Sequence, residues 1–343
     1  MLRSFRLWMG LAVSGACLWL AVRSVPIVDV GNSLAGGNYV WLVPAVVLQL
    51  SAIVTRSQRW VTLLGKSAVL GDAFWAQSIG YLFTNLLPLR AGEPTRVVVM
   101  SSKCGLPFVQ VTVTALLERL LDVATIVLVL VAVLPWMQVP ELVSHAGVAF
   151  GGVVLVALTF LLVIVRFSRL GEELIKFACT LFPALPIAAV SERWNELVAG
   201  LSPLTRLASA RWIVGWSVIT WLLSIGDYWC ILRTFQPQGA VLEAAFMAVA
   251  LSLAVAVPSS PGFIGIFQLV GQQALVLPFG NKYDAGSALA IALTAYLTYY
   301  LVTTILGLGG LWHFGQSFSG LTRVVSSWRA VGRPPSETPT IQG

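Results

Sequence analysis

Long apolar runs, separated by short charged segments, constrain this chain more than any other feature of its sequence. Runs at about 7–23, 39–55, 108–134, 148–165, 212–232 and 284–311 have the roughly 17 or more residues that an α-helix needs to cross a bilayer. Charged residues make up only 10% of the chain, whereas a soluble domain needs about a quarter. We therefore predict an all-α polytopic membrane protein with about six transmembrane helices.

Two shorter apolar stretches, about 73–87 and 241–257, stop at prolines. Each continues into a P-x-x-x-G motif, Pro88 to Gly92 in the first and Pro258 to Gly262 in the second. Short segments broken by Pro and Gly are typical of re-entrant helical hairpins, and two that enter from opposite sides indicate an inverted repeat. The sequence therefore predicts two re-entrant hairpins, with a substrate site where they meet.

The distribution of basic residues predicts the orientation. With the N-terminus inside, the basic residues of 56–103, 166–211 and 323–333 are all cytoplasmic, whereas only Arg23, Arg233 and Lys282 lie outside. This asymmetry follows the positive-inside rule. It predicts a multi-pass protein of the inner (cytoplasmic) membrane with both termini in the cytoplasm.

The organisation along the chain is simple. Residues 1–314 form the predicted transmembrane domain, and its first run is expected to be a retained helix rather than a cleaved signal. The region 168–200 mixes charged and apolar residues, which is typical of helices lying in the membrane interface. The polar segment 315–343 is predicted to be a disordered cytoplasmic tail.

Several chemistries are disfavoured by the sequence. The net charge of +7 is explained by cytoplasmic loops, and no basic run is interleaved with aromatic residues as a nucleic-acid site would be. The four cysteines and two histidines have no metal-ligand spacing, so no metal site is predicted. Phosphate-loop and dinucleotide motifs are also missing, so no cofactor is expected and no catalytic residue is assigned.

The densest group of polar residues surrounds the first break. It contains Asn85, Arg90, Glu93 and Arg96 in the run NLLPLRAGEPTR. A broken helix exposes backbone groups that lipid cannot satisfy, so the break must face protein or water. We expect Arg90 and Arg96 to grip a phosphate, because the guanidinium group matches its oxygens, with Glu93 steering an arginine or a cationic headgroup. An ordinary cytoplasmic loop is the alternative.

A second charged group lies within the apolar run 108–134. Glu118 and Asp122 share one helix face, and Arg119 lies three residues from Asp122. Charges at the bilayer centre are costly, so these residues must pair or face the interior. The sequence leaves open whether they form a structural ion network that holds Arg90 or Arg96, or belong to the substrate site.

The second break carries no formal charge. Its candidate residues are Ser259, Ser260, Gly262 and Gln268, which offer hydroxyls, an amide and close backbone approach to a ligand. Asp227 is the one acid of the run 212–232, and we interpret it as an interfacial residue beside Tyr228 and Trp229. A partner for Asp227 within the helix bundle is the alternative.

These motifs resemble a known family. The runs N-x-x-P-x-R-x-G-E-x-x-R (Asn85 to Arg96), E-R-x-x-D (Glu118 to Asp122) and P-x-x-P-G-x-x-G (Pro258 to Gly265) are similar to the flippase-like transmembrane domain of lysylphosphatidylglycerol synthases. The similarity covers roughly residues 5–312. It implies paired re-entrant helices and movement of a modified phospholipid between leaflets.

Two departures from the family pattern narrow this expectation. Only about 30 residues follow the last run, so the soluble aminoacyltransferase half is not expected here. Many relatives carry Glu where this chain has Gln268, and a neutral amide binds a cationic aminoacyl group less well than a carboxylate does. This favours another anionic lipid, such as a polyprenyl phosphate or a glycolipid.

The leading hypothesis is a lipid flippase-like transporter whose partner is a membrane lipid with an anionic headgroup. A membrane transferase, with Glu93 or Glu118 as general base, is the enzyme alternative. An accessory subunit of envelope lipid assembly is the third. Whether the protein forms homo-oligomers or binds an envelope-biosynthesis partner is left open.

Overall fold

The computed structural model describes residues 2–23, 25–87, 91–136, 187–256, 261–318 and 320, with a few positions between 152 and 173. Arg90, Ser259, Ser260, most of the predicted 148–165 span and the tail from 321 lie outside the described residues. Every regular element of the described part is helical, in agreement with the predicted class.

The first half of the described chain begins with α1 (Leu2–Val22) and α2 (Ile27–Ala35), followed by the short helix η1 (Tyr39–Trp41). It continues with α3 (Leu42–Leu64), α4 (Leu70–Leu86), α5 (Gly92–Cys104), α6 (Phe108–Val133) and η2 (Leu134–Trp136). The second half contains α9 (Ile187–Leu201), η3 (Ser202–Leu204), α10 (Leu207–Phe235), α11 (Val241–Ala256), η4 (Pro261–Phe263), α12 (Ile266–Phe279) and α13 (Ala285–His313).

Four helical segments of the described part are long and apolar enough to cross a membrane. They are Tyr39–Leu64, Leu207–Phe235, Pro261–Phe279 and Ala285–His313, and the bent pair Ala12–Val22 with Ile27–Ala35 would make a fifth span. The protein is therefore a multi-pass membrane protein, while six spans remain a prediction. The apolar length of 261–279 was not predicted, because its glycines and glutamines interrupt the apolar pattern.

The predicted end of the second span at residue 55 was wrong. Helix α3 continues without a break to Leu64 and ends at Gly65, which has a positive φ of 84°. Arg56 and Arg59 therefore lie inside a helix rather than in a cytoplasmic loop. The helix tolerates them because both side chains turn toward the protein interior, as described below.

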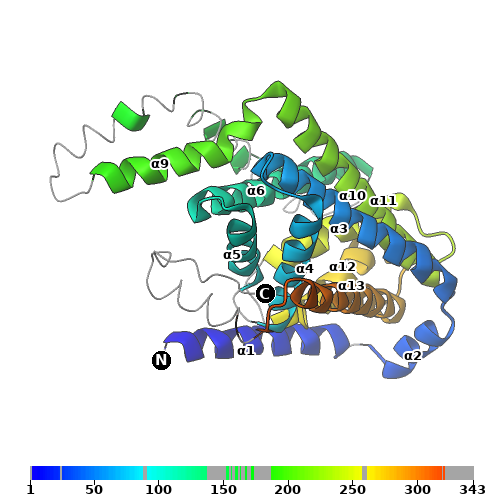
Figure 1. Cartoon of the computed structure of the whole chain (residues 1–343). Coiled ribbons are helices and arrows are strands. Elements are labelled where there is room, and N and C mark those ends of the chain that lie inside the picture. The colour runs from blue at the N-terminus through cyan, green and yellow to red at the C-terminus, as the bar shows by residue number, and fades with distance from the viewer. Residues whose placement is uncertain are drawn as a thin grey trace.

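Among the described helices, α3 and α10 share the most extensive interface, and they lie side by side in Figure 1. They run antiparallel, because Thr55 contacts Thr220 (Oγ1 to Oγ1, 2.9 Å) while Arg59, further along α3, contacts Ser217, which is earlier in α10. Leu48 correspondingly lies beside Gly226. This antiparallel pair is the central element against which α4, α6, α11 and α13 pack.

The helices around α3 and α10 form two units with matching contacts. In one unit α3 packs on α4, α4 on α5 and α5 on α6; in the other α10 packs on α11, α11 on α12 and α12 on α13. The two units also pack against each other, since α13 contacts α4 and α6 contacts α11. Leu64 and Phe235 end α3 and α10, and Leu70 and Val241 begin α4 and α11, so both pairs are 171 residues apart.

Glycines allow the two breaks to pack closely. A Cβ atom on Gly92 would lie only 1.8 Å from the carbonyl oxygen of Gly80, so only glycine permits α5 to fold back against α4. Gly262 has a φ of 68°, which favours glycine, and it sits next to the backbone oxygen of Asn85 at the end of α4. The end of α4 therefore contacts the second break directly.

Candidate functional site

A buried carboxylate, Glu118 in α6, is the centre of an ion network. Its side chain is fully buried and accepts from two arginines, Arg59 through Nη2 at 3.1 Å and Arg96 through Nη1 at 2.6 Å. These arginines come from α3 and α5 and are buried themselves. Glu118 therefore ties three helices together, and the Arg96–Glu118 pair is one of the arrangements that the sequence left open.

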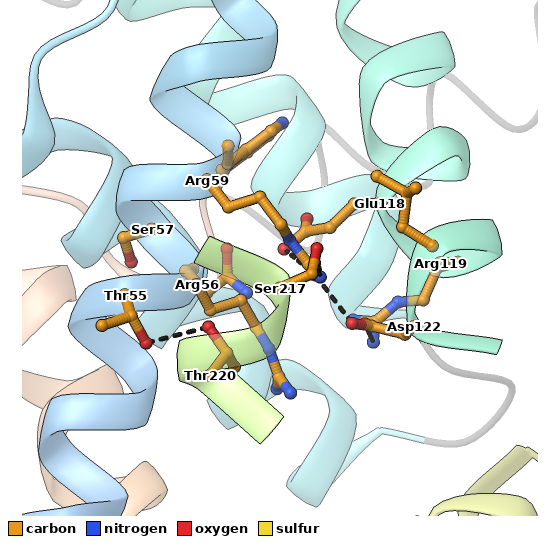
Figure 2. A network of polar contacts seen from close by, with 12 residues as sticks. Thr55, Arg56, Ser57, Arg59, Glu118, Arg119, Asp122, Ser217 and Thr220 are labelled. Carbon is orange, nitrogen blue, oxygen red and sulfur yellow. Dashed lines mark hydrogen bonds and ion pairs between the residues drawn. The ribbon is translucent and has the colours of Figure 1, made fainter. Parts of the chain in front are cut away.

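Arg59 reaches further along α6. Its Nη2 lies 2.8 Å from Oδ1 of Asp122, one helical turn beyond Glu118, and its Nη1 donates to Ser217 in α10 at 3.2 Å. Figure 2 shows Arg59 directed at both carboxylates. Buried charges are tolerated only when they are paired and hydrogen-bonded, and Arg59 meets both conditions.

The network continues toward a cavity through Glu93. This carboxylate accepts from Arg96 Nε at 2.8 Å and forms an ion pair with Arg119, which also lies 3.5 Å from Asp122. Glu93 and Arg119 are about one-third exposed, whereas Glu118 and Arg59 are fully enclosed. The network therefore extends from a fully buried part, Arg59 and Glu118, to a partly exposed part, Glu93 and Arg119, at the cavity wall.

Arg96 is held on several sides. Its guanidinium lies 4.8 Å from the ring of Trp60, whose Nε1 donates to Thr114 at 3.1 Å. Gln77 in α4 accepts from Arg96 Nη1 at 3.1 Å. These contacts hold the Arg96 guanidinium in one orientation within the network.

Arg56 is the exception among the arginines of this region. It lies one turn before Arg59 in α3, and its Nη1 donates to the Tyr81 hydroxyl at 2.8 Å. No carboxylate of the described residues lies within 4 Å of it, whereas Arg59, Arg96 and Arg119 each pair with at least two. In Figure 2 its side chain takes a different course from that of Arg59.

Part of this network faces a cavity of about 330 Å³ that is lined by residues of α3, α4, α5, α6, α10, α11, η4 and α12, with Tyr299 of α13. Its charged wall is formed by Arg56, Glu93, Arg96, Arg119 and Asp122. The rest is largely apolar or aromatic, including Trp221, Phe263 and Phe267. An apolar pocket of a few hundred Å³ with a few convergent polar groups is the usual form of a small-molecule site.

The same cavity has a second polar region on α3 and α10. Gln49 lies seven residues before Arg56, which is two helical turns, and Asp227 projects from the facing part of α10. Both amide atoms of Gln49, Oδ1 of Asp227 and Nε1 of Trp221 are buried without hydrogen-bond partners in the described structure. Buried polar atoms are rarely left unpaired, so these four atoms point to a ligand or water.

The structure places the predicted site residues in three groups. Glu93, Arg96, Arg119 and Asp122 line the cavity, and Glu118 lies directly behind them. Their predicted role in substrate binding stays a prediction, while their mutual pairing is observed.

The other described candidates, Asn85, Gly262 and Gln268, lie beside the two breaks and make contacts within the protein there. Asn85 is buried, and its Nδ2 donates to Thr303 at 2.9 Å and Thr304 at 3.2 Å in α13. Gln268 accepts from the backbone N–H of Gly265 at 2.6 Å and so caps α12. Neither Gln268 nor Gly262 lines the cavity.

Sequence reasoning missed Arg56, Arg59 and Gln49, and it misplaced Asp227. The expectation that Asp227 is an interfacial anchor was wrong, since it lines the internal cavity. One signal was present: Gln49, Arg56 and Arg59 recur at spacings of seven and three, which places them on one helix face. The positive-inside rule hid this pattern by assigning the arginines to a loop.

The chain matches the family model described as the lysylphosphatidylglycerol synthase TM region over residues 7–307. It therefore belongs to this family of membrane proteins, which is related to lipid handling. No curated protein and no solved structure matches the chain.

Proposed function

We propose that this member of the lysylphosphatidylglycerol synthase TM region family moves a lipid with an anionic phosphate headgroup between leaflets, using the cavity as the headgroup site. The observation that carries the proposal is Arg56, a cavity-wall cation whose guanidinium has no carboxylate partner among the described residues. Such a cation in a largely apolar cavity attracts an anion far more strongly than a solvated one does.

The charge balance of the network supports this choice. Arg59, Arg96 and Arg119 are matched by Glu93, Glu118 and Asp122, three positive against three negative. Arg56 is the arginine of the cavity wall that has no carboxylate within 4 Å among the described residues. We therefore assign phosphate binding to Arg56 and a positioning role to Arg96, which the sequence had suggested as a phosphate ligand.

Tyr81 completes the proposed phosphate site. Its hydroxyl oxygen accepts from Arg56 Nη1 at 2.8 Å and from Gln77 Nε2 at 3.2 Å, so its own proton is free to be donated to a phosphate oxygen. Gln77 is oriented by Arg96, whose Nη1 donates to its carbonyl oxygen. The ion network thereby positions the phosphate ligands through Gln77.

We also propose that the two helical units form an inverted repeat, with α4–α5 and α11–α12 as re-entrant hairpins. Three observations support this arrangement: the matching contacts, the spacing of 171 residues between the ends of α3 and α10 and between the starts of α4 and α11, and the approach of Gly262 to Asn85. In this proposal the protein has six spans with both termini in the cytoplasm. The predicted substrate-binding roles of Arg90, Ser259 and Ser260 stay predictions.

The experiment is reconstitution into liposomes with fluorescent phosphatidylglycerol and a membrane-impermeant quencher. Lipid should cross faster than in empty vesicles, and Arg56→Gln should abolish the gain. Arg206→Gln, an exposed arginine outside the cavity, is the matched control and should transport normally. Equal rates for Arg56→Gln and the unmodified protein would refute the proposal, and a covalent product from the lipid would favour a transferase.

A further inference from the structure

The second polar region of the cavity is composed of unpaired donors and unpaired acceptors. Nε2 of Gln49 and Nε1 of Trp221 are donors, whereas Oε1 of Gln49 and Oδ1 of Asp227 are acceptors. All four atoms are buried and belong to residues that line the cavity. Gln49 is only 6% exposed, so bulk water does not satisfy its amide.

This composition restricts the chemistry of an occupant. A phosphate accepts hydrogen bonds but cannot satisfy Gln49 Oε1 or Asp227 Oδ1, and an ammonium group donates but cannot satisfy Gln49 Nε2 or Trp221 Nε1. A hydroxyl group both donates and accepts. Several neighbouring hydroxyl groups therefore match the full set.

The surroundings agree with a polyhydroxylated group. Ser224 and Ser252 add hydroxyls to the wall, and the rings of Trp221 and Tyr228 supply flat surfaces. Asp227 has no cation of the described residues within 4 Å, so its oxygen atoms are not committed to an ion pair. The oxygen atoms of Asp227 are therefore available to the hydroxyl donors of a headgroup.

The two polar regions are arranged for one ligand. Gln49 and Arg56 lie on the same face of α3, seven residues and therefore about 10 Å apart along the helix axis. The cavity volume of about 330 Å³ admits a headgroup but not the acyl chains of a lipid as well. The chains must therefore remain in the membrane.

We propose that the cavity selects lipids whose phosphate carries a polyhydroxylated headgroup (a glycerol, an inositol or a sugar), with Gln49, Trp221 and Asp227 binding the hydroxyls while Arg56 binds the phosphate. This proposal rests on the proposed phosphate site and names the substrate class of that site. It assigns specificity to the region around Gln49 and phosphate affinity to Arg56.

The test measures binding of short-chain lipids to the full-length protein in detergent. Phosphatidylglycerol and phosphatidylinositol carry hydroxylated headgroups, phosphatidic acid carries the phosphate alone, and phosphatidylethanolamine carries an amine. The unmodified protein should bind the first two roughly tenfold more tightly than phosphatidic acid or phosphatidylethanolamine. A difference between phosphatidylglycerol and phosphatidylinositol would show whether a glycerol or a ring is preferred.

The variants separate the two proposals. Gln49→Leu should reduce affinity for the hydroxylated lipids to the level of phosphatidic acid and leave phosphatidic acid unchanged. Gln58→Leu, on the same helix but outside the cavity, should behave as the unmodified protein does. Asp227→Leu removes the acceptor at similar volume and should also lower affinity for the hydroxylated lipids only. Unchanged thermal unfolding would verify that each variant is folded.

The outcomes are distinguishable. If the unmodified protein binds phosphatidic acid as tightly as the hydroxylated lipids, or if Gln49→Leu weakens all lipids equally, the headgroup proposal is wrong while the phosphate site stands. If Arg56→Gln leaves the binding of every lipid unchanged, the phosphate site itself is wrong.

Discussion

Arg56 and Asp227 occupy equivalent positions, 171 residues apart, on the antiparallel helices α3 and α10, and both line one cavity. The same spacing relates the ends of α3 and α10 and the starts of α4 and α11. A cation and an acid thus stand at matching places in two similarly packed units. We propose that this asymmetry divides the cavity into a phosphate-binding region and a separate hydroxyl-binding region.

The first prediction concerns the core of the network. Glu118→Gln should destabilise the fold by about 3–5 kcal/mol, because it leaves the buried Arg59 and Arg96 without a shared counter-charge. Glu93→Gln should cost less, because that carboxylate is one-third exposed. Unfolding midpoints in detergent would measure both, and equal losses would contradict the idea of a sealed core.

The second prediction concerns the pairing of Arg59 with Glu118. Replacing both by methionine removes one charge of each sign and leaves Arg96 with Glu93 and Arg119 with Asp122. The double variant should therefore be more stable than either single variant. Strictly additive losses in the double-mutant cycle would mean that the two residues do not act as a pair.

The third prediction concerns the turn between α4 and α5. Gly92→Ala should prevent close packing, because the new Cβ would overlap the carbonyl oxygen of Gly80. Gly71→Ala is the matched control: it lies in α4 with nothing within 4 Å of a new Cβ, and it should be neutral or stabilise by up to about 1 kcal/mol. Thermal unfolding distinguishes them, and a neutral Gly92→Ala would contradict the described packing.

The fourth prediction concerns the start of α13, where Asp284 is the N-cap. Its carboxylate accepts from the backbone N–H groups of Ser287 at 2.9 Å and Gly286 at 2.8 Å, and these bonds, first that from Ser287, lower the pKa of Asp284. A lowered pKa means that the stabilisation is present above the pKa of the unfolded chain and is lost as pH falls through the folded value.

Two variants test this cap. Asp284→Ala should cost about 0.5–2 kcal/mol at neutral pH. Asp284→Asn keeps a capping oxygen but does not titrate, so its stability should fall less on acidification than that of the unmodified protein. A pH series of unfolding midpoints would measure the difference, and identical acid profiles for all three proteins would refute the assignment.

Part of this architecture follows from local sequence. Apolar runs identify a helical membrane protein, prolines and glycines mark the breaks at 88–92 and 258–262, and Glu93, Arg96, Glu118 and Asp122 stand out as charges in apolar surroundings. These signals are local, because each depends on neighbouring residues alone.

The cavity could not be predicted in the same way. Arg56 and Arg59 follow an apolar run and look like cytoplasmic anchors until α3 is seen to continue to Leu64 against α10. Asp227 looks interfacial because nothing near it in sequence shows that Gln49 and Trp221 share its cavity. Which arginine lacks a carboxylate depends on contacts among α3, α4, α5 and α6, which no local pattern contains.

The central claim is that Arg56 binds a lipid phosphate inside this cavity. Native mass spectrometry of the protein purified with its bound lipids tests it most directly, with Arg56→Gln and the control Arg206→Gln prepared in parallel. The account predicts a phosphate-bearing lipid on the unmodified protein and on Arg206→Gln, reduced at least about tenfold on Arg56→Gln. Equal retention of that lipid by all three proteins would contradict the account.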